Sequence, residues 1–299
     1  MNALAVAVCG VGLAFENGHA PMKAADGQIR PGRTYRTGRR WRNGAWVPAG
    51  VLVLFLVLPL VALAYRALDH ERTFNGDTWH VFRQAIWLSA YTSAATLLVI
   101  LLFGTPLAYL LARGRVPGGK FVETLIDLPM VLPPAVAGLG LLMAFGRRGI
   151  LGGQLDKIGI TLGFTTWAVI IAQIFVATPF FVRSARAGFT RVDQVIEEAA
   201  ADLGASPARV FRTVTLPMAL PGIAAGAVLA WARAVGEFGA TIMFAGNFAG
   251  RTQTMSLAIY GRYEAGDLNT ALLLAVILLV GSMLVLLTAR LVSHRQTSL

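Results

Sequence analysis

The chain has 299 residues, of which 56% are hydrophobic and only 14% are charged, and its mean hydropathy is +0.64. These values exclude an ordinary soluble globular protein and indicate an integral membrane protein. The single cysteine, Cys9, excludes an internal disulfide, and the four histidines do not form a metal-binding motif.

Six apolar windows are long enough to cross a bilayer as helices, because a hydrocarbon core of about 30 Å needs about 20 helical residues. They span residues 47–65, 85–112, 121–145, 164–182, 220–246 and 268–291. Six crossings put both termini on one side. With that side cytoplasmic, 17 lysines and arginines fall inside and 8 outside, while Arg233 lies within a span. This bias follows the positive-inside rule, so we expect both termini in the cytoplasm.

The membrane topology also explains the net charge of +11, and we therefore expect no nucleic-acid partner. Residues 1–46 are predicted to be a basic, disordered cytoplasmic extension, because their apolar start is too short for a span and lacks a basic signal-peptide region. A misassigned start before Met22 is the other interpretation of this segment.

Two classes of catalytic site are tested and rejected. The hairpin "GRVPGGKF", residues 114–121, has the glycines and lysine of a phosphate-binding loop, but Phe121 stands where a magnesium-binding hydroxyl is required. The chain also contains no HExxH or GxSxG motif. We therefore expect no catalytic residue, bound cofactor or metal on this chain.

The third window contains Asp127 and three prolines, Pro129, Pro133 and Pro134, in "IDLPMVLPPAVAG". Proline frees backbone carbonyls, which are tolerated at membrane depth only where protein or water satisfies them. The pattern favours a helix that lines the interior of a bundle, with a simple proline kink as the alternative.

The fifth window contains opposite charges at i and i+4, Arg233 and Glu237, which can pair on one helix face. Ionisable residues inside a membrane often mark a transport pathway, so Arg233, Gly236, Glu237, Phe238 and Gly239 are candidates for a pathway or gate. A structural ion pair is the alternative. The glycines around the pair, together with the Gly222 and Gly226 step, predict close helix approach or a local break.

Residues 192–217 form a polar segment between the fourth and fifth windows. Acidic residues suit the start of a first helix, Gly204 suits a turn, and Ser206 with Pro207 suits the N-cap and first position of a second helix. Pro217 and Pro221 are expected to end that second helix and open the fifth span. The segment therefore predicts a helix-turn-helix knob on the cytoplasmic face.

The same segment resembles the cytoplasmic motif E-A-A-x3-G-x9-I-x-L-P (the EAA motif) of the permease subunits of type I, binding-protein-dependent ABC importers. Val214 replaces the usual isoleucine. The resemblance implies that this knob docks on a separate ATPase subunit through the motif residues Glu198, Ala199, Ala200, Gly204, Val214, Leu216 and Pro217.

The resemblance extends over residues 88–292 and is greatest to the molybdate and tungstate branch, through "LPMVLPPAVAG", "ARAVGEFGATIMFAGN" and "RTQTMSLAIY", with the sulfate branch close. In the last motif, Leu-Pro-Leu is expected where "MSLAIY" stands. The implied fold is an all-α integral membrane protein of the type I ABC importer permease class, with six transmembrane helices and a coupling helix-turn-helix. Residues 47–87 would form the first helix and outer loop, 88–292 the permease domain and 293–299 a cytoplasmic tail.

The resemblance also implies the partners. The chain would pair with a second copy of itself, with an ATPase dimer that carries ATP and magnesium, and with an extracytoplasmic binding protein, in the cytoplasmic (inner) membrane of a bacterium or archaeon. Its cargo would be an oxyanion, molybdate or tungstate first and sulfate or thiosulfate as the alternative. A stand-alone channel or an intramembrane enzyme is the remote alternative.

Overall fold

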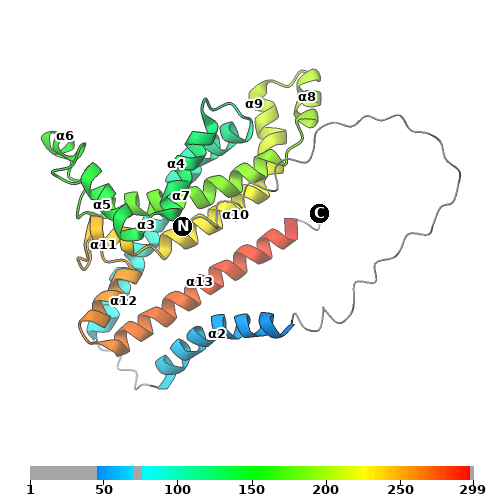
Figure 1. Cartoon of the computed structure of the whole chain (residues 1–299). Helices are drawn as coiled ribbons and strands as arrows, with labels where there is room; N and C mark the ends of the chain where they lie inside the picture. The colour runs from blue at the N-terminus through cyan, green and yellow to red at the C-terminus, as the bar shows by residue number, and fades with distance from the viewer. Residues whose placement is uncertain (1–45, 70–75, 297–299) are drawn as a thin grey trace, which may run out of the picture. The chain divides into compact units, whose positions relative to one another are not determined.

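The computed structural model describes residues 46–69 and 76–296, so most of the expected N-terminal extension and part of the C-terminal tail lie outside the described residues. The described parts are helical, with connecting turns and loops (Figure 1). The helices are α2 (Trp46–Asp69), α3 (Gly76–Ala112), α4 (Gly119–Val131), α5 (Pro134–Phe145), α6 (Gly152–Lys157), α7 (Thr166–Thr190), α8 (Gln194–Asp202), α9 (Pro207–Val210), the π-helix η1 (Phe211–Thr215), α10 (Leu216–Val235), α11 (Gly239–Ala245), α12 (Met255–Glu264) and α13 (Leu268–Gln296).

The chain divides into two compact units, residues 1–55 and 56–299. Of the first unit, the structure describes only the start of α2, which is apolar and exposed along its whole length. The helix packing described below belongs to residues 76–296 of the second unit.

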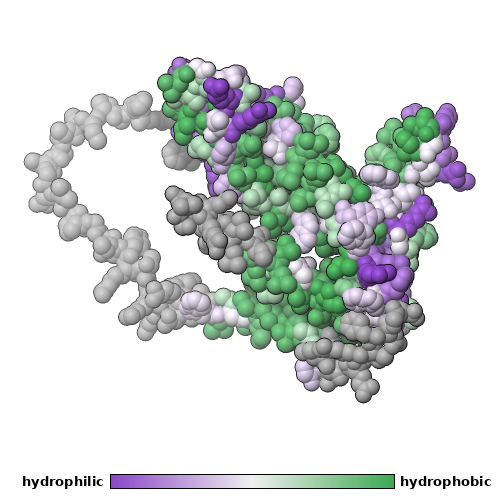
Figure 2. All heavy atoms as spheres, turned by 180° about the vertical axis from the view of Figure 1, so that it is seen from behind, coloured by the Kyte–Doolittle hydropathy of each residue, from purple (hydrophilic) through white to green (hydrophobic). Residues whose placement is uncertain are grey.

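Five helical stretches among the described residues are long and apolar enough to cross a membrane, and a bent helix pair makes a possible sixth. The five are 46–66, 78–112, 166–190, 207–235 and 268–285. They match five of the six windows predicted from hydropathy. Hydrophobic side chains cover most of the middle of the view in Figure 2, whereas hydrophilic side chains gather near its upper left and its right side.

The third window is two helices, α4 and α5, bent by 117° at the break between them. Leu132 and Pro133 are extended, with ψ of 134° and 135°, because each precedes a proline and is therefore disfavoured in the helical region. Pro134 then opens α5 at a position where its missing N–H costs nothing. The prolines thus interrupt the window over 121–145, and the bend is far sharper than the alternative of a simple proline kink.

The bent pair contacts α7 near both ends of that helix. At one end, Glu123 and Asp127 of α4 each form a 2.8 Å ion pair with an arginine in the last third of α7. At the other end, Leu141 of α5 packs in a buried cluster with Ala168 and Ala172 from the start of α7. α4 therefore lies beside the last third of α7 and α5 beside its first third, and counted as one broken span the pair would bring the number of crossings to six.

The fifth window also breaks, as its glycines predict. α10 ends at Val235, and α11 starts at Gly239 after three non-helical residues. A Cβ at Gly239 would lie only 2.4 Å from Cβ of Pro134, so the start of α11 is in close contact with the start of α5. Only glycine permits this approach.

α7 and α10 cross through glycines. A Cβ added at Gly222 would lie 2.6 Å from Cα of Gly188, and one added at Gly226 would lie 2.9 Å from the carbonyl oxygen of Phe181. Ser184 Oγ donates a 2.9 Å hydrogen bond to the Gly222 carbonyl across the contact. The close helix approach predicted from the Gly222 and Gly226 step is confirmed, and it is typical of membrane helix pairs.

α3 and α7 share a buried polar layer. Thr96 Oγ1 donates a 3.0 Å hydrogen bond to Gln173 Oε1, and Gln173 Nε2 donates a 3.4 Å hydrogen bond to Thr92 Oγ1. Gln173 is 1% exposed and both threonines are fully buried. Because an unpaired amide in hydrocarbon is costly, these bonds favour one alignment of the two helices.

Candidate functional site: a helix-turn-helix knob and a buried ion pair

The knob, residues 192–217, contains α8 at one end of the bundle (Figure 1). Asp193 caps this helix by accepting a 3.0 Å hydrogen bond from the Val195 amide. At the other end Gly204 has φ +84°, and hydrogen bonds run from Ala205 N to Ala200 O and from Gly204 N to Ala201 O. This is a Schellman motif, in which glycine adopts the left-handed conformation that closes a helix. The turn predicted at Gly204 is therefore confirmed.

The second helix of the knob begins as predicted but does not end as predicted. Ser206 is the N-cap and Pro207 the first helical residue, although the Ser206 hydroxyl makes no capping bond. The helix continues through η1 into α10 without the expected stop at Pro217. Leu216 N donates to Phe211 O, five residues back, in a π-helical turn. A proline ring clashes with the carbonyl four residues before it, and the wider turn makes room for the ring of Pro217.

The first half of the EAA motif lies on the outside of the knob. Glu198, Ala199 and Gly204 are exposed, and Ala200 is half-buried. In the second half Val214 and Leu216 are half-buried, and Pro217 is exposed. Large apolar side chains stand beside the motif, with Leu203 90% and Val195 66% exposed. Seen from behind in Figure 2, the end of the molecule that carries the knob mixes hydrophilic and hydrophobic side chains.

The inner face of α8 carries a carboxylate that the motif does not contain. Arg113 Nη2 donates to Glu197 Oε1 at 2.5 Å, and Thr215 Oγ1 donates to the same oxygen at 2.5 Å. Arg113 Nη1 also donates to the Val192 carbonyl at 3.3 Å. The side chains of Arg113 and Glu197 are 6% and 17% exposed, whereas Glu198 is exposed. Sequence reasoning missed this role, because spacing alone does not separate Glu197 from Glu198.

The second group of predicted residues meets at the break between α10 and α11. Arg233 Nη2 lies 2.6 Å from Glu237 Oε2, so the predicted i to i+4 pair forms. Glu237 is 1% exposed, and its other oxygen accepts a 2.7 Å hydrogen bond from the Ala240 amide at the start of α11. Arg233 is 28% exposed. The carboxylate is therefore fixed by both helices, and the Arg233 side chain remains partly accessible.

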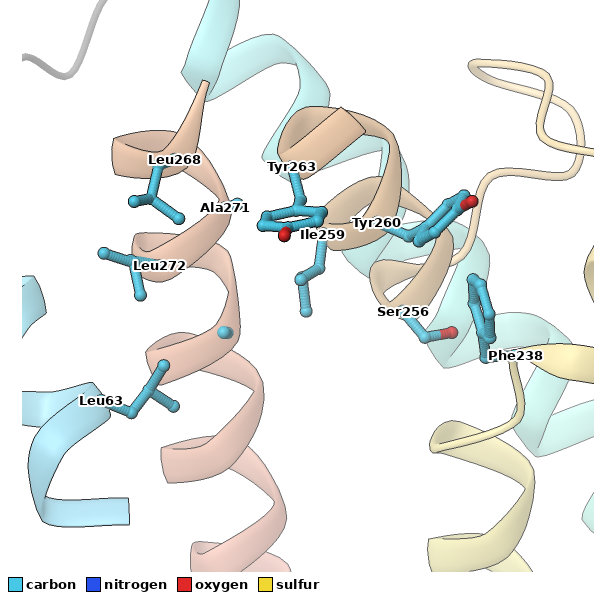
Figure 3. Close-up of a pocket in the computed structure, with 10 residues that line it drawn as sticks. Leu63, Phe238, Ser256, Ile259, Tyr260, Tyr263, Leu268, Ala271 and Leu272 are labelled. Atoms are coloured by element: carbon cyan, nitrogen blue, oxygen red, sulfur yellow. The ribbon is translucent and has the colours of Figure 1, made fainter. Parts of the chain in front are cut away.

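The residues after Glu237 connect the break to α12. Ser256 Oγ donates a 2.8 Å hydrogen bond to the Glu237 carbonyl, and the Phe238 ring lies 4.9 Å from the Tyr260 ring. Figure 3 shows these side chains at one side of an open pocket of about 370 Å³. Its lining is almost entirely aliphatic and aromatic: Leu63, Phe238, Ser256, Ile259, Tyr260, Tyr263, Leu268, Ala271, Leu272 and Ala275. Such a lining does not provide the charges that an oxyanion site needs.

Within residues 46–69 and 76–296, no three histidine, cysteine or acidic side chains come together as metal ligands. Residues 103–298 match the family model described as "Binding-protein-dependent transport system inner membrane component". The chain belongs to this family. It is therefore the multi-pass membrane component of a transport system rather than an enzyme, and the predicted identification as an ABC importer permease is confirmed.

Several curated relatives share most of their length with the chain. It is 42% identical over 248 residues to the molybdenum transport system permease protein ModB of Mycobacterium tuberculosis, which covers 83% of this chain and 92% of that one. It is 45% identical over 178 residues to ModB of Escherichia coli K12, which covers 59% of this chain and 78% of that one. A probable sulfate transport system permease protein, cysT of Chlorokybus atmophyticus, is 35% identical, covering 82% and 87%.

Solved structures show the same fold. A chain of a bacterial alginate ABC transporter, in complex with its alginate-pentasaccharide-bound periplasmic protein, superposes with a TM-score of 0.67 at 20% identity, covering 87% of this chain and 96% of that one. A chain of the MetNI methionine ABC transporter, in an inward-facing conformation, superposes with a TM-score of 0.58 at 19% identity, covering 74% and 99%. The expected type I importer permease fold is thus confirmed.

Proposed function

We propose that this chain is the permease subunit of an ATP-driven importer that carries molybdate or tungstate into the cytoplasm. Two observations together support the proposal. The EAA motif lies on a helix-turn-helix whose first helix ends in a Schellman motif at Gly204, and the chain is 42% and 45% identical to molybdenum permeases. Sulfate or thiosulfate is the second candidate cargo, because a probable sulfate permease is 35% identical. A binding assay of molybdate, tungstate and sulfate on the cognate extracytoplasmic protein discriminates among them.

In this proposal the knob docks on a separate ATPase that binds ATP and magnesium. The docking residues are Glu198, Ala199, Ala200, Gly204, Val214, Leu216 and Pro217. Val195, Ile196 and Leu203, which are at least 44% exposed, add apolar surface beside the motif. Exposed apolar side chains next to charged ones are typical of a protein interface.

The importer would contain two copies of this chain, two ATPase subunits and an extracytoplasmic binding protein, with residues 88–292 as the transport domain. Closure of the ATPases would bring the two knobs together and convert an inward-facing state into an outward-facing one. Such coupling requires that the partner binds the two states differently. The charge bias of the loops supports a cytoplasmic location of the knob and of both termini, in a bacterial or archaeal inner membrane.

The pair of Arg233 and Glu237 is proposed to lie at the transport pathway, with Gly236, Phe238 and Gly239 forming the break beside it. Glu237 is held by α11, while Arg233 keeps an accessible side that can attract an anion. Charged residues within spans usually face the bundle interior or a water-filled cavity. A packing role for the pair is the alternative.

Gly204→Asp tests the docking surface, and Gly118→Asp is its matched control. Both glycines have left-handed φ, +84° and +65°, and neither would contact another group through an added Cβ. Gly204→Asp, or deletion of Glu198 to Ala200, is expected to abolish ATPase co-purification and molybdate uptake while membrane insertion is preserved. Gly118→Asp is expected to keep ATPase co-purification and molybdate uptake. Normal co-purification and uptake in the Gly204 and deletion variants would refute the proposal.

A further inference from the structure

The junction between the knob and the spans contains one shared acceptor. Glu197 Oε1 accepts from Arg113, which directly follows α3, and from Thr215, which is the last residue of η1. Thr215 is 1% exposed, and the Arg113 side chain is 6% exposed. Charge-assisted hydrogen bonds at low exposure are stronger than those in water. α8 is therefore linked through one carboxylate to the end of one span and to the beginning of another.

The other end of η1 is held by an aromatic cluster. The Tyr109 ring of α3 lies 5.1 Å from the Phe211 ring and 5.5 Å from the Phe189 ring, both at tilted edge-on angles. The Arg113 guanidinium stands 5.8 Å from the Tyr109 ring centre. Phe211 is also the residue whose carbonyl accepts the π-helical bond from Leu216. Both ends of η1 are thus fixed to α3, one by aromatic packing and one through Glu197.

A π-helical turn is a rare and poorly packed form of helix that is often found at functional sites. Here it lies where the knob passes into α10, and its five residues contain Val214 of the EAA motif. The Glu197 carboxylate connects α8 directly to η1 and to Arg113, the residue after α3. Without the carboxylate, the π-helical turn could change its hydrogen-bonding register while α10 stays in place.

We infer that Glu197 is a positioning residue, which transmits movement of the docked knob to α3 and α10 through Arg113 and Thr215. The inference rests on the proposed coupling function and deepens it. It assigns different roles to the two faces of α8. The outer face binds the ATPase, and the inner face transmits the movement of the knob to α3 and α10. Loss of the inner bonds leaves docking intact and uncouples transport from ATP hydrolysis.

The test compares two threonines on the same π-helix. Thr215→Val removes the hydroxyl that donates to Glu197 and keeps the shape of the side chain. Thr213→Val is the matched control, because the Thr213 hydroxyl is exposed and donates only to the Arg209 carbonyl of its own helix, at 2.8 Å. Thr215→Ser restores a hydroxyl. Glu197→Gln weakens the bond to Arg113 with little change of volume.

Each variant is assembled with the ATPase and reconstituted in proteoliposomes with the cognate binding protein and molybdate. The measurements are the ATPase that co-purifies, and the molybdate taken up per ATP hydrolysed. We expect Thr215→Val and Glu197→Gln to retain normal co-purification and to lower the uptake ratio at least five-fold. Thr213→Val is expected to match the unsubstituted chain, and Thr215→Ser to recover most of the ratio.

Two results overturn the inference. If Thr215→Val and Thr213→Val give equal uptake ratios, the bonds to Glu197 transmit nothing. If Thr215→Val and Glu197→Gln lose the ATPase, the inner bonds shape the docking surface instead of transmitting movement. Failure of the unsubstituted chain itself to retain an ATPase would refute the proposed coupling function, and it is distinguished from both results because it appears without any substitution.

Discussion

The contact between α7 and α10 leads to a quantitative prediction. A methyl group at Gly222 would lie 2.6 Å from Cα of Gly188 and 3.0 Å from its nitrogen. Carbon atoms pack without repulsion at about 3.5–4.0 Å, so the helices must separate by about 1 Å to admit the group. The obstacle is backbone, which cannot turn aside as a side chain can. Overpacking of this kind costs about 1–3 kcal/mol.

The perturbation is Gly222→Ala, and the matched control is Gly281→Ala in α13. An added Cβ at Gly281 meets nothing within 4 Å. Both changes gain the helix propensity of alanine over glycine, about 1 kcal/mol, so this gain cancels in the comparison. The two variants should therefore differ in stability by about 1–3 kcal/mol, with Gly222→Ala the less stable.

Thermal unfolding in detergent is the assay. Because the unfolding entropy is about 2.1 cal/mol/K per residue, 1 kcal/mol corresponds to a Tm shift of about 1.5–2 °C for 299 residues, so Gly222→Ala should melt roughly 2–6 °C below Gly281→Ala. Equal melting temperatures would show that α7 and α10 are not in backbone contact at Gly188, and the reasoning from the glycine step would be refuted.

Three further predictions concern the break between α10 and α11 and the start of α13. Glu237→Ala should lower molybdate uptake at least ten-fold with unchanged ATPase co-purification, and normal uptake would reduce the pair with Arg233 to a packing role. Gly239→Ala should lower Tm, because its Cβ would overlap Pro134, and an unchanged Tm would contradict that contact. Asp267 caps α13 by accepting from the Thr270 amide, and its hydrogen bonds to Thr270 lower the pKa of the carboxyl group. The charged cap stabilises the fold by about 1 kcal/mol, which is fully present above the unfolded pKa of about 3.9 and is lost as pH falls through the lower folded pKa. The difference in Tm between the unsubstituted chain and Asp267→Ala should therefore disappear in acid. A Tm difference that does not depend on pH would argue against the charged cap.

Much of the fold could be predicted from hydropathy, because a bilayer demands about 20 apolar residues for each helix. The predicted first and last residues of the spans were less accurate. The fourth span continues past residue 182 to Thr190, since Ser184 and Gly188 in this last part contact α10 at Gly222. The two adjacent prolines of the third span indicated a break, but its 117° angle depends on how α4 and α5 each pack on α7.

The structure of the knob, too, could be predicted only in part. The glycine, Ser206 and Pro207 placed its turn and second helix correctly, because the constraints on these residues are local. The continuous passage through η1 could not be predicted, because proline is compatible both with a helix stop and with a helix whose preceding turn is widened. Glu197 escaped notice because its partners, Arg113 and Thr215, lie 84 and 18 residues away in the sequence.

The polar layer around Gln173 limits how the spans can move during transport. If α7 slid along α3 by one turn, about 5.4 Å, the amide would leave both threonines and face hydrocarbon without a partner. The glycine contact of α7 with α10 resists a change of spacing as well. These contacts favour movement of α3, α7 and α10 together as one rigid body. The change between inward-facing and outward-facing states would then move other helices relative to this rigid body, without changing the packing among its three helices.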